Sequence, residues 1–316
     1  MRSLIIILAL AFVGSADAQS YPAKPVRLLV GFAPGGGTDI IARLLAQSLT
    51  ERWGQPVVVE NKLGASGNIA AEVVAKSAPD GYTLLMAFSS HASNAALSKL
   101  PFDIKKDFSS ITLVGSGPAL ILANPALPAK TLAELIAYAK AHPGEIKYGS
   151  SGVGGPVHLA GELMQHLAGI EMVHVPYKGI ALAMTAILAG DIQITYATPL
   201  SAYQHLKSGR LVALSVAAPN RYPTLPEVPT AAEAGLPGYN VDFWYALIGP
   251  GGMPRALVDR IQRDVAAIVN APAMKESLLA QGVIAVGGKP DELDALITRE
   301  YEQWVKVVRA RNVKFE

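Results

Sequence analysis

The sequence predicts an α/β protein with two lobes, each a mostly parallel β-sheet flanked by helices. First, apolar runs typical of buried strands alternate with segments whose apolar residues recur at helical spacing, which indicates a parallel sheet with crossover helices. Second, a unit of strand, glycine turn and helix begins near residue 26 and again near residue 146. Third, apolar runs near 118–123 and 243–248 can carry the chain from one lobe to the other and back. These crossings predict a cleft between the lobes.

The composition favours a large core and excludes several kinds of site. Of 316 residues, 51% are hydrophobic and only 16% charged, so disorder is not expected. The formal net charge is +2 without a dense basic run, which argues against nucleic acid as a partner. The chain has no cysteine, which excludes thiol catalysis, zinc–thiolate sites and disulfides.

The N-terminal segment is expected to direct export. A basic residue, Arg2, precedes an apolar run at 4–13, and Ala16-Asp-Ala18 follows that run. This pattern is typical of a signal peptide spanning 1–18. The run has about half of the ~20 residues that a spanning helix needs, although a retained membrane anchor remains the alternative. No other segment is long and apolar enough to span, so we expect an exported protein that is not membrane-embedded.

The first strand is expected at 26–32 and the first helix at 40–52, joined by a proline and three glycines at 34–37. Such a turn directs free backbone N–H groups and the positive end of a helix dipole at one small volume. That volume suits a carboxylate, whereas the alternative is that the glycines only close a tight βα connection. The helix cap is expected at Thr38 or Asp39.

Two further polar turns follow strands in the same half of the chain. We expect strands at 56–60 and 82–88, followed by turns at 61–67 and 89–94, with a helix at 69–77. In parallel sheets, ligands bind beyond the carboxyl ends of the strands. Because all three turns should lie at this edge, together they favour an anion site.

The next apolar run, 111–123, is expected to leave the first lobe as a strand broken by a bend at 115–118. The second lobe then repeats the alternation of strands and helices. Its expected helices are 131–141, opened by a capping box of Thr131 and Glu134, 157–167 and 181–189; its strands are 146–148, 171–175, 192–197 and 211–217; its turns are 149–156 and 176–179.

The last part of the chain is expected to return to the first lobe. A proline-rich connection at 222–230 leads to a short helix at 230–234, and an apolar run at 241–249 forms the second crossing. Trp244 in this run is expected either to line the cleft or to pack the hinge. Helices are then expected at 254–269, 274–282 and 290–309. We assign 20–121 and 245–316 to the first lobe and 122–244 to the second.

Five stretches resemble one known family. They are Phe32-Ala-Pro-Gly-Gly-Gly-Thr-Asp39, Asn61-Lys-Leu-Gly-Ala-Ser-Gly-Asn-Ile-Ala-Ala-Glu72, Pro79-Asp-Gly-Tyr-Thr-Leu-Leu85, Tyr148-Gly-Ser-Ser-Gly-Val-Gly-Gly-Pro-Val-His158 and Val175-Pro-Tyr-Lys-Gly179. They look like motifs of the tripartite tricarboxylate transporter substrate-binding proteins, also called the Bug family. The motifs are long, in order and correctly spaced, and the resemblance covers essentially all of the mature chain.

The resemblance implies a periplasmic solute-binding protein with the two-lobed periplasmic-binding-protein fold (Venus flytrap, type II). It implies no enzymatic activity and no cofactor, and family members are usually monomers. They mostly hold small carboxylates and deliver them to a membrane permease of one large and one small subunit. Some members instead serve sensing, so a subunit that presents ligand to a membrane kinase is an alternative.

The family's ligand contacts can be transferred to the matching positions. In the first lobe they are Phe32, Gly35, Gly36, Thr38, Ala65, Ser66, Gly67, Ser89 and Ser90; in the second they are Ser150, Ser151, Gly152, His158, Tyr177, Lys178, Gln193 and Ala197. Asp39 would repel a carboxylate, so it is expected to cap its own helix and hold the turn. Gln193 and Ala197 stand where the family commonly has acidic residues, so the resemblance implies no particular substrate.

Three other kinds of site are weaker alternatives. His158, Glu162 and His166 share a predicted helix face and could bind a metal, although three ligands along one face rarely meet one ion. Neither Gly35-Gly-Gly37 nor Gly152-Val-Gly154 completes a dinucleotide fingerprint. The serine-rich turns leave an exported hydrolase open, but no Gly-x-Ser-x-Gly elbow is present.

Overall fold

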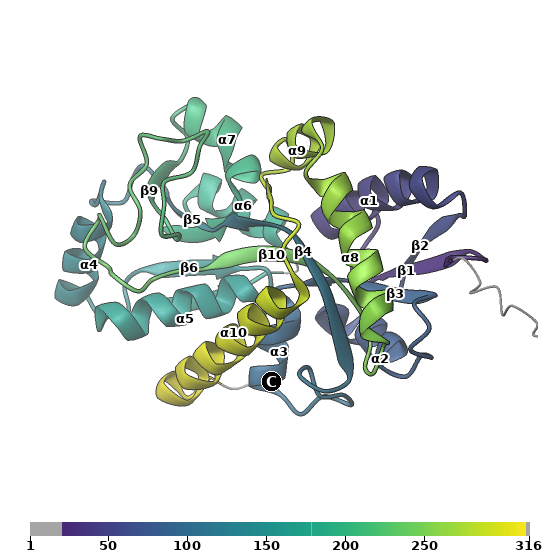
Figure 1. Cartoon of the computed structure of the whole chain (residues 1–316). Coiled ribbons are helices and arrows are strands. Elements are labelled where there is room, and N and C mark those ends of the chain that lie inside the picture. The colour runs from purple at the N-terminus through teal and green to yellow at the C-terminus, as the bar shows by residue number, and fades with distance from the viewer. Residues whose placement is uncertain (1–20, 178, 314–316) are drawn as a thin grey trace, which may run out of the picture.

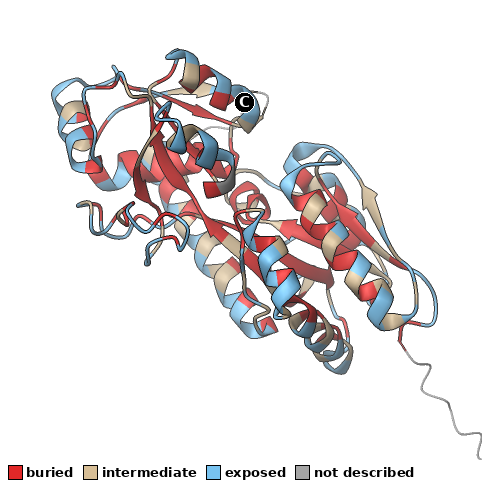
Figure 2. Ribbon diagram, turned by 90° about the horizontal axis from the view of Figure 1, so that it is seen from above, coloured by how far each residue is buried: buried red, intermediate tan, exposed pale blue. Residues whose placement is uncertain are grey.

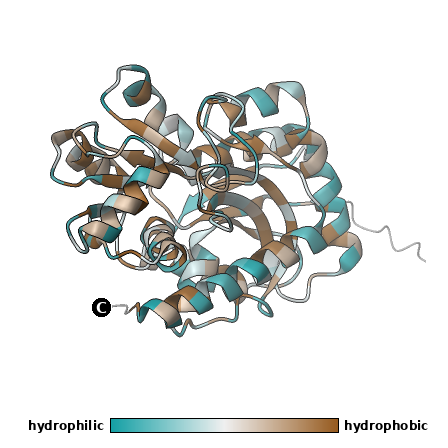
Figure 3. Ribbon diagram, turned by 90° about the vertical axis from the view of Figure 1, so that its left-hand side faces the viewer, coloured by the Kyte–Doolittle hydropathy of each residue, from teal (hydrophilic) through white to brown (hydrophobic). Residues whose placement is uncertain are grey.

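The computed structural model describes residues 21–177 and 179–313 and contains two mixed β-sheets, each flanked by helices (Figure 1). The signal peptide expected at 1–18 lies outside the described residues, and so does Lys178. Buried residues concentrate in the strands of both sheets (Figure 2), and the same strands are largely hydrophobic (Figure 3). The two sheets therefore form the centres of two lobes.

The sheet of the first lobe has six strands within the described ranges. Their order is β11 (Ile284–Ala285), β4 (Phe108–Pro118), β10 (Asp242–Pro250), β3 (Thr83–Phe88), β1 (Val26–Val30) and β2 (Val57–Asn61). Strands β1, β2 and β3 are parallel, whereas β10 is antiparallel to both β3 and β4. The strands with crossover helices are therefore parallel, and the strands that connect the lobes are not.

Helices cover both faces of this sheet because successive residues of a strand point to opposite faces. Leu28 packs in a core with α1 (Gly37–Trp53) and α8 (Arg255–Val269). Leu29 packs in a second core with α2 (Asn68–Ala75), α3 (Ser90–Leu97) and the first half of α10 (Pro290–Arg311). A short helix, α9 (Pro272–Leu279), precedes β11.

In the second lobe the described part of the sheet has five strands. Their order is β7 (Val173–Pro176), β6 (Lys147–Ser150), β8 (Ile194–Ala197), β5 (Leu120–Ala123) and β9 (Val212–Val216). Strand β6 is parallel to β7 and β8, and β5 is antiparallel to β8 and β9. Helices α4 (Leu132–Ala141) and α5 (Pro156–Ala168) share the core on one face, and α6 (Ile180–Ala189) and α7 (Pro199–Lys207) share the core on the other.

The apolar run expected as one strand at 111–123 is two strands in different sheets. Strand β4 ends at Pro118 and β5 begins at Leu120, so Ala119 between them belongs to neither strand. Instead, the Ala119 N–H donates to the Val241 carbonyl at 2.9 Å, next to the return crossing. Glycine is required within this run, because a Cβ at Gly117 would lie 2.3 Å from the Gly282 carbonyl oxygen.

The carboxyl ends of the parallel strands border the crossing in both lobes. Strand β10 enters the first lobe beside the end of β3, where Tyr245 lies opposite Phe88. Strand β5 begins beside the end of β8, where Leu120 lies opposite Ala197. The turns that follow the parallel strands of the two sheets are thus brought toward each other by the topology.

Helix α10 packs against both lobes (Figure 1). Leu293 and Ile297 lie in a core of the first lobe, whereas Trp304 and Val307 lie in a core of the second. Trp244 is fully buried, and its indole N–H donates to Glu300 of α10 at 2.7 Å. Of the two roles expected for Trp244, its position fits hinge packing.

Three further elements differ from the sequence prediction. Helix α7 was missed, although Thr198 caps it and Pro199 opens it, which is a recognisable signal for a helix start. Strand β11 is only two residues long and was also missed. The short helix expected at 230–234 is a hydrogen-bonded turn, closed by the Ala234 N–H and the Thr230 carbonyl at 3.0 Å.

Candidate ligand-binding site

Some of the backbone N–H groups in the turn between β1 and α1 are already hydrogen-bonded within the turn. The Gly35 N–H donates to Asp39 Oδ2 at 2.9 Å, and the Gly36 N–H donates to the Ala33 carbonyl at 3.2 Å. Among the described residues, the N–H groups of Gly37 and Thr38 have no acceptor. The first helical turn, not the glycines before it, therefore offers donors to a ligand.

The cap of α1 was expected at Thr38 or Asp39, and this prediction is wrong. The N-cap is Gly36, which has no side-chain capping bond, because the helix already begins at Gly37. Asp39 therefore lies inside the first turn, from where its carboxylate reaches back to Gly35 and holds the turn.

Asp39 is buried, with only 2% of its surface exposed, and is held in its ionised form. Burial opposes ionisation, but hydrogen bonds from Arg43 (2.8 Å), the Gly35 N–H and Asn61 (2.8 Å) outweigh it and lower the pKa of Asp39 to about 2. Asn61 also donates to the Phe32 carbonyl at 2.9 Å, which ties the end of β2 to the same turn. Arg43 neutralises the charge that would otherwise repel an anionic ligand.

The second turn, after β2, contains four consecutive residues with positive φ: Gly64, Ala65, Ser66 and Gly67. Ser66 in this left-handed region (φ 53°) is a strained conformation for a residue with a side chain. Ala65 and Ser66 are exposed, and within the described chain their N–H groups have no acceptor. Successive free N–H groups in such a turn form a concave anion-binding arrangement.

Helix α3 holds this strained turn in place. The Ser66 carbonyl accepts hydrogen bonds from Ser90 Oγ (3.2 Å) and Asn94 Nδ2 (3.3 Å). Gly67 packs directly against Gly31 at the end of β1, where a Cβ on Gly31 would lie 2.4 Å from Gly67 Cα. Asn94 was not predicted as a site residue, although it belongs to the expected polar turn at 89–94.

The polar turn expected at 89–94 is mostly helical, because α3 already begins at Ser90, and this helix start places Ser89 and Ser90 at the same edge. Both are buried, and the Ser89 N–H donates to the Trp244 carbonyl at 3.1 Å. His91, which the sequence did not predict as a site residue, lies behind them. Its Nδ1 lies 3.1 Å from the Phe88 backbone nitrogen and 2.9 Å from the Phe88 carbonyl oxygen. Burial lowers the pKa of His91, so the ring is neutral. Phe32 packs with its ring perpendicular to His91, with centroids 6.5 Å apart.

The glycine turn after β6 is the counterpart in the second lobe. Ser150 is fully buried, and its Oγ accepts the Gly152 N–H at 3.1 Å and lies 2.6 Å from His174 Nε2. His158 at the start of α5 accepts the Gly154 N–H at 2.9 Å. Ser151 lies in the same turn and is half-buried. His158 therefore lies behind the turn, and His174, which sequence reasoning missed, lies beside it.

The remaining predicted residues of the second lobe do not all gather at this turn. The Tyr177 N–H donates to the Ser150 carbonyl at 3.0 Å, and Ala197 is buried at the end of β8. Gln193 precedes β8 at its opposite end, where its Oε1 accepts the Lys147 N–H at 2.9 Å. The length of β8 separates Gln193 from Ala197, so the structure does not bring Gln193 to the other candidate residues.

The alternative metal site does not form in the structure. His158 and Glu162 are buried, whereas His166 is exposed. Across residues 21–177 and 179–313, no group of three His, Cys, Asp or Glu residues is placed to hold a metal ion. Over the same ranges, no helix has both the length and the apolar character required to cross a membrane.

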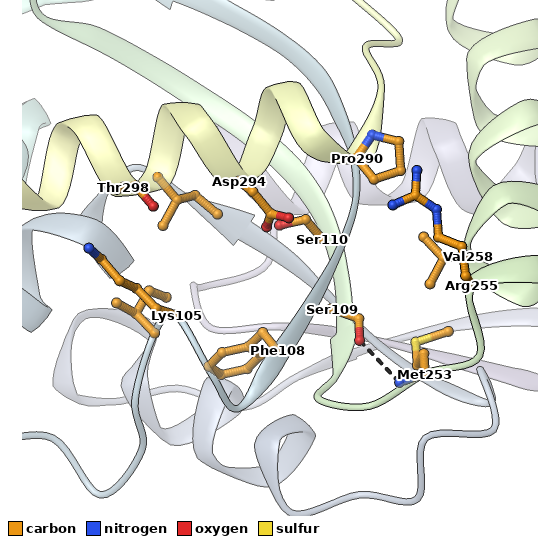
Figure 4. Close-up of a pocket in the computed structure, with 12 residues that line it drawn as sticks. Lys105, Phe108, Ser109, Ser110, Met253, Arg255, Val258, Pro290, Asp294 and Thr298 are labelled. Carbon is orange, nitrogen blue, oxygen red and sulfur yellow. Dashed lines mark hydrogen bonds between the residues drawn. The ribbon is translucent and has the colours of Figure 1, made fainter.

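A pocket of about 310 Å³ lies at the end of β4 that is remote from the crossing, between β4, α8 and α10 (Figure 4). Its cationic side chains are already paired: Arg255 contacts Asp259 (2.8 Å) and Asp291 (2.9 Å), and Lys105 contacts Glu302 (3.4 Å). This pocket therefore offers no free cation to an anionic ligand, and we place the candidate site at the turns that border the crossing.

Comparisons of the chain with known proteins agree on one family. Residues 41–313 match the model of the tripartite tricarboxylate transporter family receptor. The chain is 35% identical to the protein BugT of Bordetella pertussis over 315 residues, which cover 99% of this chain and 97% of BugT.

Two solved structures from Rhodopseudomonas palustris share the fold. Rpa4515 with adipate has a TM-score of 0.81 and 34% identity, covering 93% of this chain and 99% of Rpa4515. MatC with bound malate has a TM-score of 0.79 and 32% identity, covering 91% of this chain and all of MatC (100%). With its two sheets, its flanking helices and this match over most of its length, the chain belongs to the tripartite tricarboxylate transporter receptor family of periplasmic binding proteins.

Proposed function

We propose that this protein captures a small organic carboxylate in a cleft between its lobes and delivers it to a tripartite tricarboxylate-type transporter. The observation that supports this most directly is the set of free backbone donors at one sheet edge, at Gly37 and Thr38 and again at Ala65 and Ser66. Donors at a helix N-terminus and in a left-handed turn stabilise an oxyanion through both hydrogen bonds and the local dipole.

The relatives support the carboxylate as the chemical class. The structures of Rpa4515 and MatC carry adipate and malate, which are both dicarboxylates. The first lobe here can hold one carboxylate at its turns, while the second lobe, with Ser151 and Tyr177, contacts the other end. A ligand that contacts both lobes binds the closed form better, and this difference in affinity drives closure.

The same proposal covers the place of action and the partners. Segment 1–18 directs export to the periplasm, where the protein acts as a monomer and presents its ligand to the large and small permease subunits. It requires no cofactor and releases the ligand unchanged. Uptake of labelled ligand by proteoliposomes that contain the permease should therefore depend on adding this protein.

Thermal unfolding against a panel of mono-, di- and tricarboxylates tests the ligand class. A ligand that binds only the folded state raises stability by RT ln(1 + [L]/Kd), which is about 2.7 kcal/mol at 100 Kd. The corresponding amides, which have the same shape without the charge, should give no shift. A shift with a sugar or a metal ion and none with any carboxylate would contradict the proposal.

Gly37 allows a sharper test of the backbone donors. It is the first residue of α1, where proline is compatible with the helix, so Gly37→Pro removes one N–H while leaving the helix start intact. Gly37→Ala adds a side chain but keeps the N–H and serves as the matched control. Because a hydrogen bond to a charged group contributes about 1.5–3 kcal/mol, Gly37→Pro should weaken binding about 10- to 100-fold relative to Gly37→Ala. Equal affinities of the two variants would show that this donor does not contact the ligand.

A further inference from the structure

Two histidines form a stacked pair directly beneath the glycine turn of the second lobe. The rings of His158, from α5, and His174, from β7, lie parallel within 10° with centroids 3.8 Å apart. Tyr148 of β6 lies beside both rings, with its centroid 5.0 Å from that of His174 and 6.4 Å from that of His158. The pair is thus fixed between three elements of the lobe and cannot rotate freely.

Each histidine contacts a different part of the turn. His158 Nδ1 accepts the Gly154 N–H at 2.9 Å, and His174 Nε2 lies 2.6 Å from Ser150 Oγ. Ser150 Oγ in turn accepts the Gly152 N–H at 3.1 Å. The two imidazoles therefore fix both ends of the segment 150–154, in which Gly152 and Gly154 have positive φ (136° and 78°). Glycines leave this segment with little stiffness of its own, so its shape depends on these contacts.

The contact of His158 defines its protonation state. Nδ1 accepts a hydrogen bond from a backbone N–H, so it carries no proton, and the neutral ring holds its proton on Nε2. An imidazolium has a proton on both nitrogens and could not accept the Gly154 N–H. The hydrogen bond therefore exists only while His158 is neutral.

The surroundings favour the neutral pair. Burial lowers the pKa of His158, against the attraction of Glu162, whose Oε1 lies 3.8 Å from His158 Nε2. Burial and the neighbouring His158 lower the pKa of His174 to about 3. Glu162 itself accepts hydrogen bonds from Tyr148 (2.6 Å) and Arg311 (3.1 Å), so its charge is largely neutralised by other groups.

We propose that His158 and His174 are positioning residues that hold the 150–154 turn in the shape that binds ligand, through one specific ring nitrogen each. This inference rests on the proposed function, because it assigns a role within the same site. Ser150 and His174 are as close as a nucleophile and its base, but Ser150 is fully buried and its Oγ is bonded to the turn itself. The pair therefore shapes the site and does not attack a substrate.

Asparagine and glutamine variants can distinguish the roles of the two ring nitrogens of each histidine. The amide of asparagine reaches about the place of a histidine Nδ1, whereas the longer glutamine reaches about the place of Nε2. At position 158 we expect His158→Asn to keep the acceptor for Gly154 and His158→Gln to lose it. At position 174 we expect the reverse, with His174→Gln retaining the contact to Ser150 and His174→Asn losing it. His142, which is exposed, provides the control through His142→Gln.

The first measurement needs no ligand. Amide hydrogen exchange of Gly152 and Gly154 should be at least tenfold faster in His158→Gln and His174→Asn than in the wild type. It should stay within about threefold in the two opposite variants and in His142→Gln. If the asparagine and glutamine variants at each position exchanged alike, the assignment to specific nitrogens would be overturned.

The second measurement uses malate and adipate as probes, together with whichever carboxylate gives the largest thermal shift. We expect about tenfold weaker binding for His158→Gln and His174→Asn, with rescue in His158→Asn and His174→Gln. Unchanged affinity in all four variants, despite faster exchange, would overturn the role in ligand binding. Absence of binding to any carboxylate, with the exchange pattern as expected, would instead contradict the proposed function and leave the structural role intact.

A variant that fails to fold does not block the test, because the wild-type protein reports the protonation state directly. In ¹⁵N spectra between pH 8 and pH 7, His158 should show an unprotonated Nδ1 and a protonated Nε2. Protonation of Nδ1 in this range would overturn the inference.

Discussion

Replacing Asp39 with asparagine removes one buried charge while keeping the size of the side chain. In the wild type this carboxylate accepts hydrogen bonds from the Gly35 N–H, Arg43 and Asn61. The amide of asparagine has only one acceptor oxygen, and its NH2 group would face donors. The turn that presents Gly37 and Thr38 should loosen as a result.

The magnitude follows from the pKa of Asp39. These contacts lower it from 3.8 to about 2, despite burial, and each unit corresponds to about 1.36 kcal/mol. The ionised form therefore stabilises the fold by about 2 kcal/mol at pH 7. At ~2.1 cal/mol/K of unfolding entropy per residue, this should lower the Tm of Asp39→Asn by about 3 °C.

The pH dependence fixes the sign of this effect. A carboxyl whose pKa is lower in the folded than in the unfolded state contributes stability above its unfolded pKa, and this contribution is lost as the pH falls. The difference between the wild type and Asp39→Asn should therefore be full at pH 6–7 and shrink between about pH 4 and pH 2. Urea unfolding of both proteins across this range measures it directly.

Glu72 provides the matched control for Asp39. It also pairs with a cation four residues along its helix, Lys76, but on the surface. Glu72→Gln should cost no more than about 0.5 kcal/mol, because exposed ion pairs contribute little. An equal loss in the two variants, or a loss in Asp39→Asn that does not depend on pH, would refute the reasoning.

Two other predictions concern buried polar groups. Burial, reinforced by a nearby carboxyl, raises the pKa of Glu300 to about 8, so the folded state favours the protonated form and loses stability as the pH rises from about 4.5 to 8. The variant Glu300→Gln can still accept the Trp244 N–H. In thermal unfolding it should be more stable than the wild type by at least about 1 kcal/mol at pH 8 and show no gain at pH 4.5. Asn94→Ala leaves the Ser66 carbonyl with Ser90 as its side-chain donor. This variant should lose about 1 kcal/mol of stability and should bind carboxylate more weakly in calorimetry. An affinity equal to that of the wild type would show that the turn does not need this contact.

Much of the fold could be predicted from local patterns. The β-branched residues of β1 and β2, the helical spacing along α1 and the proline that opens α8 are properties of short segments, and they indicated the elements correctly. The run at 111–123 was harder, because an apolar pattern does not show that a chain leaves one sheet and enters another. That break depends on Ala119 pairing with Val241, more than a hundred residues away.

The candidate site divides in the same way. The sequence indicated three glycine- and serine-rich turns on one sheet edge. The structure places two of these turns there and, in place of the third, the start of α3. It could not indicate which donors in those turns are free. The N–H groups of Gly35 and Gly36 already donate to the Asp39 carboxylate and the Ala33 carbonyl. The free donors in this turn are therefore the N–H groups of Gly37 and Thr38.

The sequence by itself determined the family, the alternation of strands and helices, and the chemical class of the turns, since each depends on residues that are neighbours along the chain. Only the tertiary structure decided that His174 of β7 reaches Ser150 of β6, that Gln193 lies at the far end of β8, and that α10 joins both lobes. These contacts depend on the strand order and on packing between distant segments. Two groups form a hydrogen bond only when the fold brings them close together. For segments that are distant along the chain, no local sequence pattern shows which groups will meet.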